Sequence, residues 1–161
     1  MELLKFPHVS LFKPCEPITA FGEELLILLN GMWDVMIKHG GIGLSANQVD
    51  LPYRMFTMLG PDNEKLFIVN PKILLQSKTP ANVGEGCLSA PGEFLVLNER
   101  TMWVQIMYQD ETGGPRSAKF QGLHAVCVQH EMDHLDGKSH LQSKSLSRAR
   151  RRELAKKWGI K

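Results

Sequence analysis

The segment QHEMDHL, residues 129–135, contains the pattern H-E-x-x-H inside a stretch with helical spacing of apolar residues. Residues four apart lie above one another on a helix, so His130 and His134 can turn their imidazole rings to one metal ion. Glu131 is offset enough to accept a proton from water that the metal polarises. The segment therefore predicts a helix that carries a hydrolytic metal centre.

A catalytic metal held by two helical histidines needs a third protein ligand. Cys127 stands on the same predicted helix, but it is seven residues from His134, about 10.5 Å along the axis at 1.5 Å per residue. A thiolate and an imidazole can hardly converge on one ion across that distance. Burial as a small apolar residue is the better interpretation of Cys127, because valines flank it on both sides.

The segment GEGCLS, residues 84–89, offers the third ligand through Cys87. Glycines on both sides of Glu85 let the backbone turn closely around a site while the thiol points inward. The main-chain N–H of Leu88 could donate to an oxyanion there. A glycine-rich surface loop with an incidental cysteine would have the same features, so this segment alone leaves the choice open.

The segment GIGLSANQ, residues 41–48, joins glycines to small residues and ends in a carboxamide. It lacks the G-x-G-x-x-G spacing and the lysine of nucleotide-binding loops. Its small residues permit close approach of an extended ligand, and Gln48 adds a donor that needs no charge. The segment is also expected to form the tight connection between the first helix and the first strand.

Apolar periodicity indicates one helix from Thr19 to His39 and a second from Leu123 to Asp136. The chain between them has the turn residues and apolar runs of strands, expected at 53–59, 65–70, 94–97 and 101–108 with a hairpin connection at 110–114. Strands grouped between helices favour an α+β fold over alternating βαβ units. We therefore expect antiparallel or mixed sheets around a central H-E-x-x-H helix, preceded by an N-terminal helix.

The 161 residues, 43% of them hydrophobic, suit one globular domain. No apolar run is long enough to span a membrane and no signal peptide is recognisable, so a cytoplasmic location without a membrane partner is expected. The three cysteines are too few for a disulfide scaffold. Residues 142–161 carry a charge of +7 and residues 1–141 a charge of −5, so a basic tail, expected to be helical, follows a catalytic body.

Together the three segments resemble the signature of the peptide deformylase family, a glycine-rich G-x-G-x-A-A-x-Q segment followed by E-G-C-L-S and Q-H-E-x-D-H-L. The resemblance covers about residues 1–141, with the motifs in the family's order and at similar spacing. It implies hydrolysis of the formyl group from N-formyl-methionine at the start of nascent chains, with release of formate. It also implies a monomeric enzyme, and no DNA partner is expected.

The resemblance implies roles for individual residues. Cys87, His130 and His134 match the ligands of one divalent metal, usually Fe²⁺ in the cell, which Zn²⁺, Ni²⁺ or Co²⁺ can replace. Glu131 matches the general base, and Gln48 and the main-chain N–H of Leu88 match the groups that hold the formyl oxygen. The residues that match the methionine pocket are Ile42, Gly43, Val83, Glu85, Leu123, Val126, Cys127 and His130.

Three features depart from the family's usual pattern. Ser45 stands where alanine is usual and adds a hydroxyl near the site. The run from Ala90 to Phe94 lacks an arginine that, in bacterial members, often lies there to contact the substrate backbone. The C-terminal helix is short, in keeping with a compact version of the enzyme such as a virus could encode, and a virus-encoded enzyme would act in the host cytoplasm. The basic tail is either a solvated helix or a contact with the ribosome.

Other functions fit parts of the pattern. H-E-x-x-H alone is typical of zinc peptidases, but their third ligand is normally a downstream His or Glu, and His140 lies only six residues after His134. A metal-free cysteine hydrolase would use Cys87 and His130 and would be indifferent to chelators. A non-catalytic protein with a structural zinc would need four protein ligands, and the sequence offers three convincing ones.

Overall fold

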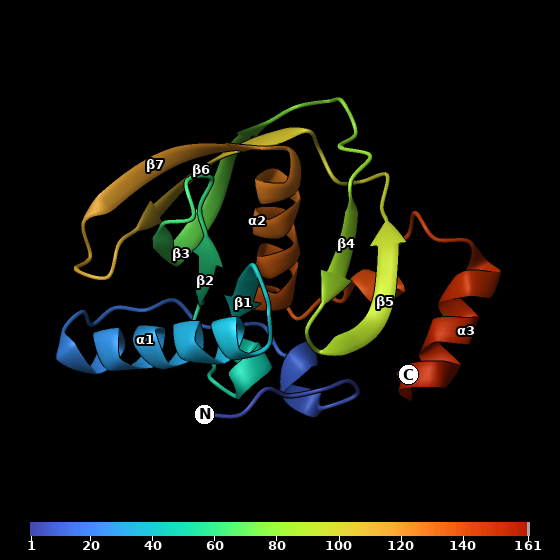
Figure 1. The fold of residues 1–161 in the computed structure, drawn as a ribbon, viewed down its shortest axis with the longest axis horizontal. Coiled ribbons are helices and arrows are strands. Elements are labelled where there is room, and N and C mark those ends of the chain that lie inside the picture. The colour runs from blue at the N-terminus through green and yellow to red at the C-terminus, as the bar shows by residue number, and fades with distance from the viewer. Residues whose placement is uncertain (161) are drawn as a thin grey trace.

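Helix α2 (Gly122–Leu135) stands at the centre of the molecule, with a larger sheet on one side and a two-stranded sheet on the other (Figure 1). The structure is a computed structural model that describes residues 1–160. The other helices are α1 (Glu23–Lys38) and α3 (Arg148–Trp158). The strands are β1 (Gly43–Ser45), β2 (Met55–Leu59), β3 (Lys65–Gln76), β4 (Gly84–Cys87), β5 (Ala90–Val96), β6 (Trp103–Gln109) and β7 (Pro115–Gln121). The predicted α+β class with antiparallel sheets is confirmed.

The larger sheet has the strand order β1-β2-β3-β6-β7, and every neighbouring pair in it is antiparallel. Its inner face carries fully buried side chains, among them Phe56, Ile68 and Ile106, which pack against the apolar face of α2. This burial fixes the rotation of α2 about its axis. Because apolar residues of α2 face the sheet, its histidines are left to face the other side.

The smaller sheet pairs β4 with β5, with Glu85 opposite Leu95 and Gly86 opposite Phe94. The alternative of a glycine-rich surface loop, left open for residues 84–89, is wrong for the first four residues, which form a strand. Glycines are disfavoured in strands by their backbone entropy, but pairing with the apolar β5 outweighs that preference. The strand holds Cys87 in a fixed position opposite α2.

Helix α1 buries one face, formed by Leu25, Leu29, Met32 and Met36, against β1 and β2. It begins four residues later than expected and ends at Lys38, with Gly40 just beyond it at φ 69°. Glycine adopts this left-handed conformation without strain, so the chain can reverse into β1. The reversal places the 41–48 segment beside α2. None of the helices within residues 1–160 has the length and apolar character needed to cross a bilayer.

Helix α3 packs beside β5, at the edge of the hairpin that lies away from α2 (Figure 1). Ser147 caps its first turn by accepting a hydrogen bond from the main-chain N–H of Arg150. Leu154 is fully buried in a cluster that also contains Leu95 and Phe6. The helix is therefore not solvated on all sides, because its apolar residues at four-residue steps form a packing face.

Candidate active site and metal centre

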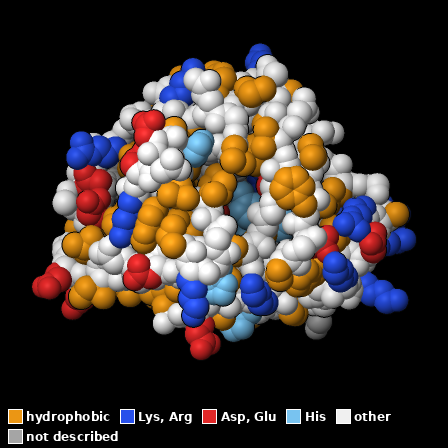
Figure 2. All heavy atoms as spheres, in the orientation of Figure 1, with side chains coloured by type: hydrophobic (Ala, Val, Ile, Leu, Met, Phe, Trp, Pro, Cys, Tyr) orange, Lys and Arg blue, Asp and Glu red, His pale blue; other side chains and the backbone are white. Residues whose placement is uncertain are grey.

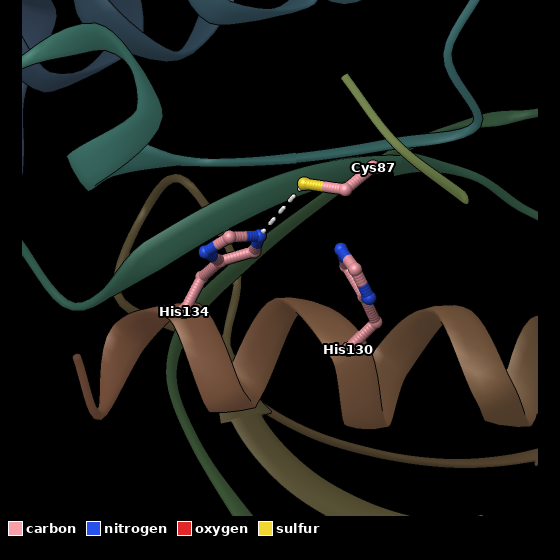
Figure 3. A group of neighbouring side chains, drawn as sticks. All are labelled: Cys87, His130 and His134. Carbon is pink, nitrogen blue, oxygen red and sulfur yellow. Dashed lines mark hydrogen bonds between the residues drawn. The ribbon is translucent and has the colours of Figure 1, made fainter. Parts of the chain in front are cut away.

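Cys87 from β4 meets His130 and His134 from α2 in the space between the hairpin and the helix (Figure 3). One ligand atom from each residue lies within 4.8 Å of the other two, and all three side chains are buried. The Cys87 Sγ and His134 Nε2 atoms are 3.2 Å apart. One thiolate and two imidazoles suit a borderline first-row divalent cation, so this donor set fits a single metal ion.

A buried ion-pair network lies directly behind His130. The Nδ1 atom of His130 is 2.9 Å from Glu85 Oε1, which leaves Nε2 for the metal site. Arg100 donates from Nε to Glu85 Oε2 at 2.5 Å and from Nη2 to Oε1 at 2.7 Å, and from Nη1 to Asp133 at 2.6 Å. Burial alone would raise the pKa of Glu85, but the hydrogen bonds from Arg100 and His130 lower it to about 2.

His134 lies deeper than His130 and is surrounded by a different set of groups. The ring of Phe6 stacks on it at 6.3 Å between centroids, and burial lowers the pKa of the imidazole well below its usual value. The imidazole is therefore in the neutral form that binds metals. The side chain of Asn47 donates to the main-chain carbonyl of His134 at 2.5 Å, which ties the 41–48 segment to the helix.

Glu131 projects from α2 into the cleft beside the three-residue cluster. Its Oε2 atom is buried and has no hydrogen-bond partner within residues 1–160. Burial raises the pKa of this carboxyl group. A side chain on Gly43 would place its Cβ 2.5 Å from Glu131 Oε1 and 2.6 Å from Cys127 Sγ, so only glycine leaves room for both. Glu131 is thus a partly desolvated carboxylate with one oxygen free to exchange a proton.

Ser45 fixes the orientation of the Gln48 side chain. The amide oxygen of Gln48 accepts hydrogen bonds from the Ser45 N–H at 2.9 Å and from its hydroxyl at 3.0 Å. The amide nitrogen therefore turns the other way, 3.6 Å from Cys87 Sγ and 3.1 Å from Ser89 Oγ. The hydroxyl at position 45 thus orients an amide donor toward the candidate site.

A cleft of about 570 Å³ is lined by these residues and by parts of β1 and β4. Figure 2 shows hydrophobic side chains gathered around this hollow. The cleft is lined by most of the residues predicted to contact substrate, namely Ile42, Gly43, Gln48, Glu85, Leu88, Leu123, Val126, Cys127, His130 and Glu131. Val83 was also predicted to contact substrate, but this half-buried residue does not line the cleft. Glu85 borders the cleft, but its carboxylate is committed to Arg100 and His130.

Sequence reasoning did not identify Arg100 or Phe94. Arg100 is only 4% exposed and binds two carboxylates that lie far from it along the chain, so no local pattern marks it. Phe94 lines the cleft although it was considered only as part of a strand. The sequence did contain one indication for Phe94. It lies in the run 90–94, which lacks the substrate-contacting arginine often found there in bacterial members of the family.

The chain is similar to known proteins along most of its length. A family model described as polypeptide deformylase matches residues 1–150. A curated peptide deformylase of Phenylobacterium zucineum (strain HLK1) is 37% identical over 160 residues, covering 97% of this chain and 93% of that protein. The crystal structure of a peptide deformylase from Ehrlichia chaffeensis superposes with a TM-score of 0.90 at 30% identity, covering 99% of this chain and 94% of the other. One from Synechococcus elongatus, in complex with actinonin, superposes with a TM-score of 0.88 at 31% identity, covering 99% and 86%.

Proposed function

The chain belongs to the peptide deformylase family, and we propose that it performs the family's reaction with Glu131 as the base beside a metal held by Cys87, His130 and His134. The reaction is hydrolysis of the N-terminal formyl group of newly synthesised peptides, which releases formate and a free amine. The observation that carries the assignment of residues is their convergence. A thiol and two imidazoles lie within 4.8 Å of one another, next to a buried carboxylate at the wall of one cleft.

The metal would supply a Lewis acid that activates water near neutral pH. Glu131 then accepts a proton from the attacking water at Oε2 and delivers it to the nitrogen of the departing amine. Its unpartnered oxygen supports this role, because no hydrogen bond has to break before the proton is taken. Its raised pKa supports the second half of the cycle, since a more basic carboxylate retains the proton until it is transferred to the nitrogen as the C–N bond breaks.

Gln48 and Leu88 are proposed to receive the charge that develops on the formyl oxygen. The amide nitrogen of Gln48 is held toward Cys87 by the two bonds that Ser45 makes to the amide oxygen. The main-chain N–H of Leu88 follows Cys87 directly and borders the same cleft. Loss of one such donor typically lowers the rate by about 10²–10³-fold.

The methionine side chain is proposed to enter the part of the cleft formed by α2, with Leu123, Val126 and Cys127 as its apolar wall. These residues lie one or two turns before His130, so the pocket adjoins the metal site. Burial raises the pKa of the Cys127 thiol well above its usual value, so this residue contributes a neutral apolar surface. A formyl group would then lie over the metal ligands when the side chain is in place.

The metal itself is proposed to be Fe²⁺ in the cell, with Zn²⁺, Ni²⁺ and Co²⁺ as substitutes. The mixed sulfur and nitrogen donor set is compatible with all four cations, and which ion is bound in the cell then depends on metal availability as well as on affinity. The enzyme is further proposed to act in the cytoplasm, where nascent chains emerge, and to act as a monomer. Gel filtration combined with light scattering of the metal-loaded protein tests the oligomeric state, and a dimer mass would contradict it.

Formate release from formyl-Met-Ala-Ser tests the proposal against its alternatives. We expect formate from the formylated peptide, no cleavage of unblocked Met-Ala-Ser, and loss of activity after chelation. Peptide-bond cleavage would indicate a zinc peptidase instead, and activity indifferent to chelators would indicate a cysteine hydrolase. Glu131→Gln should keep its metal and lose at least 10²-fold in rate, whereas Cys87→Ala should lose the metal.

Residues 142–161 are proposed to contact the ribosome through the outer face of α3, while residues 1–141 form the catalytic body. Arg148, Arg152 and Lys156 are exposed at four-residue steps, so their side chains form one basic stripe. The opposite face of the helix is held by the body through Leu154 and through Glu93. Orientation of a positive stripe away from the body supports a polyanionic partner such as ribosomal RNA.

Reversing the charge of the basic stripe tests the proposed ribosome contact without unfolding the helix. The triple substitution of Arg148, Arg152 and Lys156 to Glu should abolish co-sedimentation with ribosomes at low salt, and salt should weaken the wild-type contact steeply. The matched control places Glu at Lys13, Lys72 and Lys78, which are exposed on the body. Equal co-sedimentation of the two triple variants would exclude the stripe as the contact.

A further inference from the structure

Phe94 is a large aromatic side chain on the rim of the cleft, and 71% of it is exposed. It lies on β5, whose side chains alternate between two faces. Glu93 and Leu95 are buried, and Phe94 and Val96 point outward. An exposed aromatic ring beside a substrate cleft is a candidate contact for the substrate.

The ring of Phe94 lies across the two glycines of β4. A Cβ on Gly84 would fall 2.1 Å from Cε1 of Phe94, and a Cβ on Gly86 would fall 3.8 Å from Cδ2. The ring therefore covers the backbone of β4 at positions that have no side chain of their own. Its second face is left open on the outer side of the hairpin.

The alternation along β4 relates this ring to the metal site. Glu85 and Cys87 point inward to α2, whereas Gly84 and Gly86 lie on the outer face with Phe94. Strand β4 is paired with β5 on one side only, and its other edge borders the cleft. A peptide that lies extended along this free edge has side chains that alternate in the same way.

We propose that Phe94 binds the side chain of the second substrate residue and makes the enzyme prefer apolar or aromatic residues there. The proposal rests on the proposed function, in which the methionine side chain points inward to α2. Because side chains alternate in an extended peptide, the next one points outward, over the bare backbone of Gly84 and Gly86. Of the two outward side chains of β5 beside these glycines, Phe94 lines the cleft, whereas Val96, opposite Gly84, lies outside the cleft lining.

Substrate pairs that differ only at the second residue test this assignment. For the metal-loaded wild type, kcat/KM for formyl-Met-Phe-Ser should exceed that for formyl-Met-Ala-Ser by about 3–10-fold, the range typical of aromatic contacts. In Phe94→Ala this ratio should fall to about 1, and Phe94→Tyr should restore it. The control is Val96→Ala, two residues along on the same exposed face but outside the cleft, which should keep the ratio.

Two results would overturn the assignment: a ratio that Phe94→Ala leaves unchanged, or a ratio that falls equally in Val96→Ala. Failure of the proposed function looks different, because no variant would then release formate from either peptide. In that event, calorimetric binding of the unformylated peptides Met-Phe-Ser and Met-Ala-Ser still tests Phe94. A tighter fit of Met-Phe-Ser that disappears in Phe94→Ala supports the contact, and equal affinities exclude it.

Discussion

Arg100 and Glu85 form an ion pair with two hydrogen bonds, at 2.5 and 2.7 Å, in which both side chains are only 4% exposed. The same carboxylate contacts Nδ1 of His130, so Glu85 alone separates the guanidinium from a proposed metal ligand. A carboxylate behind a ligating imidazole fixes the ring and raises its basicity. Arg100 is therefore a positioning residue that acts through Glu85.

Arg100→Gln should weaken metal binding and destabilise the fold. The substitution leaves the buried carboxylate of Glu85 without its guanidinium and the partly exposed Asp133 without its partner, and loss of the buried pair costs on the order of 3–5 kcal/mol. Metal affinity should fall about 10–100-fold, as measured by competition with a chromophoric chelator. Arg54→Gln is the matched control, since its partner Asp136 is at the surface and the loss should stay below about 1 kcal/mol in urea unfolding. Equal losses in the two variants would contradict a role for Arg100 behind the site.

Gly43→Ala should abolish activity while leaving the metal in place. The added Cβ would lie 2.5 Å from Glu131 Oε1, so the carboxylate has to move by a distance that catalysis does not tolerate. We expect a loss of at least about 10²-fold in kcat/KM, because misplacement of a catalytic group by 1 Å has effects of this size. Metal content by atomic absorption should match the wild type, since Cys87, His130 and His134 are untouched. Normal turnover of the variant would show that Glu131 is not the base.

The iron-loaded enzyme should lose activity in air, and the nickel-loaded enzyme should keep it. Cys87 borders the open cleft, so oxygen can reach a thiolate beside a redox-active ion. The measurement is the half-life of formate release in air for each form, with mass spectrometry of the peptide that contains Cys87. Added oxygen at Cys87 should accompany the loss, and equal lifetimes of the two forms would refute this explanation.

Acid should weaken the contact between α3 and the hairpin, because protonation removes the negative charge of Glu93 that binds Arg150 and Lys157. The hydrogen bond from Lys157, with further help from Trp158 and Arg150, holds the pKa of Glu93 below its usual value of 4.5. A group with a lowered pKa stabilises the fold above its unfolded pKa, and this contribution disappears as pH falls through the folded pKa. The difference in unfolding free energy between the wild type and Glu93→Gln should therefore be largest near pH 7 and should shrink progressively as pH falls below the usual carboxyl pKa of 4.5. A difference that does not change with pH would exclude this linkage.

Local patterns predicted the helices well, because periodicity and caps lie within a few residues of one another. The position of His130 and His134 on one face of α2 is of this kind. Strand β3 was expected to end at Asn70, but it continues to Gln76 through Pro71. A register shift between Val69 and Lys72 accommodates the proline, and only the partner strand β6 determines that shift.

Features that depend on distant partners could not be predicted in this way. Arg100 meets Glu85 across 15 residues and Asp133 across 33, and neither separation has a periodic signature. The burial of Leu154 depends on the hairpin surface that receives it. The roles of the individual site residues remain predictions that the variants above will test.

The apolar cluster behind Cys87 joins segments that a ribosome delivers at very different times. Phe6 is made early, Cys87 and Leu95 midway, and Leu154 and Ile160 more than fifty residues later, yet all belong to one buried group. During synthesis the hairpin therefore lacks part of its support until residue 160 has emerged. An enzyme that acts on the first residue of nascent chains thus completes its own active centre only late in its own translation.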